Sequence, residues 1–80
     1  MVKKTSKEQR TLSDAVEELE MKLPWADSIR LLPNESSIVM EHIWEGRNLG
    51  FKVQYLGAAE MTADEITSDF LQRLSAHMKA

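Results

Sequence analysis

Hydrophobic residues recur with two different periods along the chain, and the change of period predicts its secondary structure. From Thr11 to Leu23 they follow steps of four, three and four residues, which places them on one side of an α-helix. These positions are Leu12, Val16, Leu19 and Leu23. Pro24 lacks an amide hydrogen and restricts the residue before it, so we expect the helix to end there.

After this helix the period becomes two, which is typical of strands. Turn residues separate three alternating runs, so we expect two hairpins in succession. The predicted strands are 29–32, 37–44 and 49–56, and the predicted turns are 33–35 and 45–48.

A second helix is predicted from Thr62 onwards. Thr62-Ala63-Asp64-Glu65 is a capping-box sequence, in which the threonine hydroxyl and the glutamate carboxylate satisfy free backbone donors. Hydrophobic residues then follow at steps of four: Ile66, Phe70, Leu74 and Met78.

The order α-β-β-β-α predicts an α+β fold, a two-layer sandwich in which both helices cover one face of a three-stranded antiparallel meander. In the middle strand, alternation is expected to turn Ile38, Met40 and Trp44 inward, although the opposite phase is open. Val39, Glu41 and Ile43 then face outward beside Lys52, so the uncovered face would carry apolar residues suited to docking.

Charge divides the chain into two parts. The 80 residues carry a net charge of −3, yet the first ten carry +3. We therefore expect residues 1–10 to form a flexible basic arm and residues 11–80 to form one domain. Ser6 and Gln9 offer an alternative, because a capping box there would extend the first helix into the arm. The basic residues of the arm are Lys3, Lys4, Lys7 and Arg10.

Composition argues against several classes of protein. The chain has no cysteine, which excludes disulfides, thiolate zinc sites and cysteine catalysis and agrees with the cytoplasmic location that we expect. No apolar run is long enough to span a membrane, and the N-terminus does not resemble a signal peptide. A domain of this size also offers little room for an enclosed active site, so we expect no enzyme.

The motifs of catalysis and metal binding are missing as well. His42 and His77 are the two histidines, and neither belongs to a zinc-binding helix motif. Ser36 and Ser37 lie in turn sequence rather than in a nucleophile elbow. We therefore predict no catalytic residue, no metal and no cofactor.

The element order resembles that of the double-stranded RNA-binding domain, over Thr11 to Ala80. That family binds phosphates through lysines at the start of its last helix and through a Gly-Pro-x-His loop between its first two strands. Here the helix start contains Asp64, Glu65 and Asp69, and the first hairpin reads Pro33-Asn34-Glu35-Ser36. The resemblance is one of topology, and nucleic-acid binding would depend on the basic arm.

The sequence therefore favours a small acidic, non-enzymatic interaction module that binds a protein through its open sheet face or acidic helix faces. Trp25 and Trp44 are candidate anchors, because indoles dominate interface energetics. Two alternatives stay open, namely a nucleic-acid-binding protein that uses its arm and a structural homodimer subunit. The predicted partner-binding residues are Val39, Glu41, Ile43, Trp44, Arg47 and Lys52.

Overall fold

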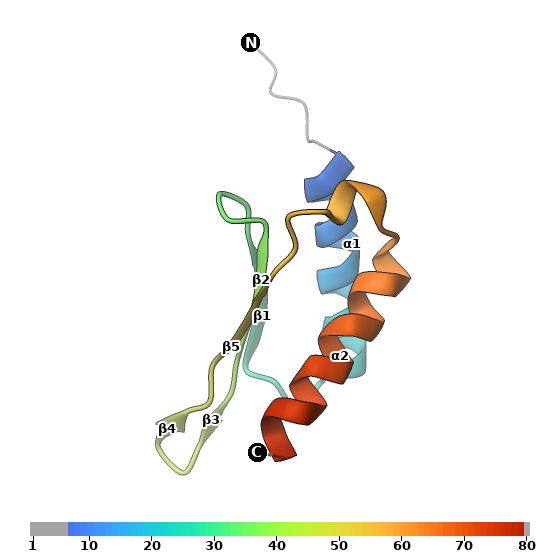
Figure 1. Ribbon diagram of the computed structural model, residues 1–80. Helices are drawn as coiled ribbons and strands as arrows, with labels where there is room; N and C mark the ends of the chain where they lie inside the picture. Colours follow the sequence, from blue (N-terminus) through green and yellow to red (C-terminus); the bar gives the residue numbers. More distant parts are fainter. Residues whose placement is uncertain (1–6, 80) are drawn as a thin grey trace.

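A computed structural model describes residues 7–79 and shows the expected α-β-β-β-α order. Helices α1 (Lys7–Lys22) and α2 (Ala63–Lys79) lie on one side of a three-stranded antiparallel sheet (Figure 1). The sheet contains β1 (Ser28–Leu32), β2 (Ser37–Glu41) and β5 (Phe51–Gln54), in that order. The predicted two-layer fold is confirmed.

Helix α1 begins at Lys7, four residues before the expected start. Lys7 and Arg10, which we placed in a flexible arm, therefore lie on its first turns, as the capping-box alternative allowed. The segment Lys-Glu-Gln-Arg consists of good helix formers, and the Glu8 carboxylate accepts a 2.6 Å hydrogen bond from the Ser36 hydroxyl. Lys3 and Lys4 lie outside the described residues.

The capping box at the start of α2 is present as predicted. The Thr62 hydroxyl accepts a 3.1 Å bond from the Glu65 amide, and the Glu65 carboxylate accepts a 2.8 Å bond from the Thr62 amide. A short 3₁₀ helix, η1 (Ala58–Glu60), which the sequence pattern did not indicate, joins β5 to this cap.

A small hairpin continues the sheet and slants away from the helices (Figure 1). It consists of β3 (Ile43–Trp44) and β4 (Arg47–Asn48), and it forms its own two-stranded ladder. The predicted four-residue turn is therefore a two-residue loop, in which Glu45 and Gly46 have φ angles of 50° and 76°. Positive φ at both positions is the mark of a type I′ turn, whose twist suits a tight hairpin.

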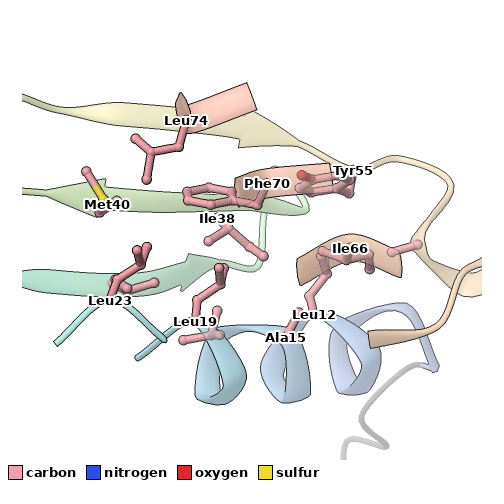
Figure 2. Packing of buried hydrophobic residues seen from close by; sticks show 13 residues of the cluster. Leu12, Ala15, Leu19, Leu23, Ile38, Met40, Tyr55, Ile66, Phe70 and Leu74 are labelled. Carbon is pink, nitrogen blue, oxygen red and sulfur yellow. The ribbon is translucent and has the colours of Figure 1, made fainter. Parts of the chain in front are cut away.

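The core lies between the sheet and the two helices (Figure 2). The hydrophobic positions predicted for the two helices are buried, with one exception. Met78, the last of them in α2, is exposed. From the sheet, Ile38 and Met40 point inward as predicted, and Tyr55 closes the end of β5. The buried hydrophobic residues are Leu12, Ala15, Val16, Leu19, Leu23, Ile29, Ile38, Met40, Tyr55, Ala58, Ile66, Phe70 and Leu74.

Trp44 corrects one prediction, because 59% of its surface is exposed. Trp44 lies on the same side of the strand as Met40 and His42, so the alternation of side chains predicted its side correctly. The hairpin slants away from the helices, however (Figure 1), and leaves the indole exposed.

Candidate functional site

The six predicted partner-binding residues do not form one surface. Val39, Glu41 and Lys52 lie on the open face of the sheet, where Arg30, Val39 and Lys52 are neighbours across the three strands. The others, Ile43, Trp44 and Arg47, belong to the projecting hairpin and are exposed.

The open face of the sheet is mainly polar, so the expectation of an apolar docking face is not met. Arg30 forms a 3.0 Å ion pair with Glu41, and Lys52 forms a 2.8 Å ion pair with Glu35. Among the outward side chains of the three strands, only Leu32 and Val39 are apolar, and both are partly covered. Single apolar residues of this kind are ordinary on protein surfaces.

Exposed apolar side chains gather instead at one end of the molecule, beside the hairpin and the C-terminal end of α2. Figure 1 shows this end at the bottom of the view. We call this surface the end patch, and define it as Trp25, His42, Trp44, Leu49 and Met78, which line a shallow hollow of about 480 Å³. The exposed fractions are 42% for Trp25, 44% for Leu49 and 62% for Met78. Contiguous apolar exposure of this kind is typical of interaction sites.

Local structure positions each member of the end patch. Trp25 follows Pro24, where the chain leaves α1. Trp44 stands beside the type I′ turn and pairs with Arg47 across the hairpin. Leu49 donates a 2.7 Å backbone bond to the His42 carbonyl, and Met78 lies in the last turn of α2.

His42 joins the two indoles of the end patch. Its ring centroid lies 5.1 Å from that of Trp25, edge to face, and 6.2 Å from that of Trp44. Aromatic rings attract one another at such separations. The imidazole therefore fixes both indoles without burying them.

Asp27 anchors this arrangement to the start of β1. Its Oδ2 accepts a 2.5 Å hydrogen bond from the Ile43 amide and lies 3.1 Å from His42 Nδ1. The Ile43 amide, followed by His42, lowers the pKa of the Asp27 carboxyl although partial burial opposes the shift. The hairpin is therefore held by an ionised side chain.

The charges beside the end patch are mostly positive, unlike those of the chain as a whole. Lys79 follows Met78, Arg47 is paired with Trp44, and Lys22 precedes Trp25 by three residues, while Glu45 at the hairpin tip and Asp27, which contacts His42, are acidic. These three cationic and two anionic groups together carry a net charge of +1, and all five side chains are exposed.

A second polar cluster connects β5 to α2. Asp69 Oδ2 accepts 2.7 Å bonds from the Tyr55 hydroxyl and from Arg73 Nε. Burial, together with the Asp69 carboxylate, raises the pKa of Tyr55. Burial alone would raise the pKa of Asp69, but Tyr55 and Arg73 lower it overall. The tyrosine stays protonated as a donor, so the cluster has the character of a structural link rather than of a nucleophile.

The basic residues of the arm that fall within residues 7–79 lie on the first turns of α1. Lys7 and Arg10 project from α1 and are exposed. The start of α2 presents Asp64 and Glu65, which repel phosphate. Lys7 and Arg10 therefore gain no support for phosphate binding from the start of the last helix.

Residues 7–79 contain neither a cluster of metal ligands nor a membrane-spanning helix. No group of three or more histidine, aspartate or glutamate side chains in this range is placed to hold a metal ion. Neither helix in the range combines the length and the apolar character needed to cross a bilayer.

Sequence reasoning identified two of the five members of the end patch. It singled out Trp25 and Trp44 as candidate anchors, from their type alone, but it missed Leu49 and Met78. Met78 was expected to be buried as the last member of a helix stripe. Only the geometry of the hairpin shows that these four residues, far apart along the chain, share one surface.

Comparisons with known proteins add no relative. No protein-family model matches the chain, and neither the curated proteins nor the solved structures contain a match.

Proposed function

We propose that this protein is a non-enzymatic interaction module whose end patch binds a segment of a partner protein that carries apolar anchors and acidic flanks. The observation that supports the proposal most strongly is the exposure of two indoles, a leucine and a methionine around one hollow. Tryptophan is enriched among the residues that dominate binding energy, and methionine adapts to irregular partners.

The chemistry of the partner follows from the charges beside the patch. Lys22, Arg47 and Lys79 outnumber Asp27 and Glu45, so an acidic segment is attracted and a basic one is repelled. This differs from the net charge of −3, which by itself favours basic partners. Charges next to the patch matter more, because salt screens charges farther than about 8 Å at physiological ionic strength.

The size of the hollow limits the strength of the interaction. At about 480 Å³ it accommodates a few side chains of one helix turn or one extended segment. Contacts this small belong to the weak, transient class of interface, well below about 1,200 Å² of total buried area. We expect dissociation constants in the micromolar range.

Selection from a library of random displayed peptides tests the proposal. Binders to the intact chain are counter-selected against Trp44→Ala, so that the surviving peptides depend on the patch. Leu56→Ala is the matched control, because Leu56 is an apolar residue with 73% exposure outside the patch. We expect enriched peptides with apolar anchors and acidic flanks, which lose at least tenfold in affinity to Trp44→Ala and none to Leu56→Ala.

Three outcomes would overturn the proposal. The first is a selection that yields no peptide able to distinguish the intact chain from Trp44→Ala. The second is enrichment of basic flanks. The third is tight, salt-sensitive binding of duplex RNA that survives Trp44→Ala and disappears when Lys7 and Arg10 are replaced by alanine.

A further inference from the structure

Strand β5 lies at one edge of the sheet, and its outer side has no partner strand within residues 7–79. The direction of its backbone groups follows from two hydrogen bonds. The amides of Leu49 and Tyr55 each donate a 2.7 Å bond towards the β2 side, to His42 and Ser36. Because these groups alternate in an antiparallel ladder, the backbone groups of Lys52 and Gln54 point outward.

The side chains of these two residues do not cover the outer edge. Lys52 Nζ is bound to the Glu35 carboxylate at 2.8 Å, and Gln54 Nε2 donates a 2.9 Å bond to the Glu35 carbonyl. Glu35 belongs to the turn between β1 and β2, so both side chains lie over the open face and towards the neighbouring strands. The donors and acceptors of the edge are therefore accessible to another strand.

A groove runs beside this edge on the helix side. It has a volume of about 670 Å³ and is bounded by β5 and the C-terminal half of α2. Its strand wall contains Phe51 and Val53, which are only partly buried. Its helix wall contains Arg73, Ala76 and His77, and the small side chain of Ala76 leaves room above the strand.

We propose that β5 pairs antiparallel with β5 of a second copy of this chain, about a two-fold axis at Val53, to form a continuous six-stranded sheet. This proposal concerns a surface distinct from the end patch and does not depend on the proposed function. Edge-to-edge pairing is a common way for sheets to recruit a further strand.

The register follows from the groups that the edge exposes. Both copies present the backbone groups of Lys52 and Gln54, so ladder bonds form only where even-numbered residues face one another. An axis at Val53 places Lys52 opposite Gln54 of the second copy, and each such pair exchanges two backbone bonds. An axis at Lys52 would place two ammonium groups opposite each other, which is unfavourable.

A second copy would also cover the apolar side chains of the groove. The chosen axis places Val53 against Val53 and Phe51 near Tyr55 of the second copy, all on the helix side. These contacts would cover Phe51 and Val53, which the single chain leaves partly exposed. A chain of this length has a small core, and the joined sheets would enlarge it.

The oligomeric state tests the proposal through sedimentation equilibrium between about 1 μM and 1 mM, and three substitutions test the register. Lys52→Pro removes an outward amide and spares the ladder with β2. We expect the intact chain to dimerise and Lys52→Pro to remain monomeric with an unchanged far-ultraviolet circular dichroism spectrum. Gln54→Glu would face Lys52 of the second copy and tighten the dimer severalfold, whereas Gln54→Lys would weaken it at least tenfold.

The two Gln54 variants keep the test decisive if Lys52→Pro does not fold. A chain that is monomeric at 1 mM would overturn the proposal. So would a dimer that responds alike to Gln54→Glu and Gln54→Lys, or one that Trp44→Ala abolishes, since that dimer would form through the end patch. Loss of peptide binding by Trp44→Ala without any change in dimerisation bears on the proposed function alone.

Discussion

The Tyr55 hydroxyl donates a 2.7 Å hydrogen bond to Asp69, and through it the end of β5 is joined to the middle of α2. Arg73 holds the same carboxylate from the next turn of the helix. We expect Tyr55→Phe to keep the packing of the ring but to lower the free energy of unfolding by about 1–2 kcal/mol, because an ionised acceptor loses a buried donor. Urea denaturation followed by circular dichroism measures this difference, and a change below about 0.3 kcal/mol would contradict it.

The same link predicts a dependence of stability on alkaline pH. Burial and Asp69 raise the pKa of Tyr55, so above about pH 10 the unfolded chain loses a proton that the folded chain retains. The folded state then binds more protons, and its stability falls as pH rises. We expect the free energy of unfolding of the intact chain to approach that of Tyr55→Phe between about pH 10 and 11.5. Since lysines titrate in both proteins, only the difference between them is diagnostic.

Local sequence signals predicted local structure reliably. The pairing of Thr62 with Glu65 depends on four consecutive residues, and the structure contains both of its hydrogen bonds. The positions of Leu12, Leu19 and Phe70 likewise follow from helical spacing, because each helix has one face that can be buried.

The sequence predicted less well which side chains are buried, because burial depends on where neighbouring elements end. Alternation placed Trp44 on the helix side of its strand, yet its burial depended on how far α2 extends and on the position of the hairpin. The outward face of the sheet is another example, since Arg30 and Lys52 cover Val39 from both sides only once the register is fixed. The candidate site therefore required the structure, whereas the fold did not.

The capping box itself is open to test. Thr62→Ala removes the acceptor of the Glu65 amide, so we expect a loss of about 1 kcal/mol in the free energy of unfolding. Ser68→Ala is the control, because Ser68 is exposed within the same helix and is not part of the cap. Thermal denaturation of both variants measures the effect. If Ser68→Ala destabilised the protein as much as Thr62→Ala does, the cap would not be the cause.

Gly46 in the turn of the projecting hairpin and Gly57 before η1 both have open space around them, but their backbone conformations differ. Gly46 has a φ of 76°, a backbone angle that residues with a side chain rarely adopt, although a Cβ there would meet nothing within 4 Å. We expect Gly46→Ala to cost about 1–2 kcal/mol from the backbone alone. Gly57 also has open space around it but a φ of −98°, so Gly57→Ala should be neutral or slightly stabilising. Equal destabilisation by the two substitutions in urea would contradict this explanation.

Asp27 should control how firmly the hairpin is held. Its carboxylate accepts the Ile43 amide at 2.5 Å, and Asp27→Ala removes that acceptor while leaving the ladder between β3 and β4 intact. We expect the protection of the Ile43 amide against hydrogen exchange to fall about tenfold or more, with little effect on amides in the middle of β2.

The pKa of Asp27 gives this prediction a second, independent measurement. Because the Ile43 amide lowers that pKa in the folded state, the stabilisation is present above the ordinary pKa near 4 and is lost as pH falls through the lower, folded value. In the intact chain, protection of Ile43 should therefore decrease on acidification below about pH 4, after correction for the intrinsic exchange rate. In Asp27→Ala it should not depend on pH over this range. A matching decrease in both proteins would show that another carboxylate holds the hairpin, and the two indoles of the end patch would then owe their spacing to that group instead.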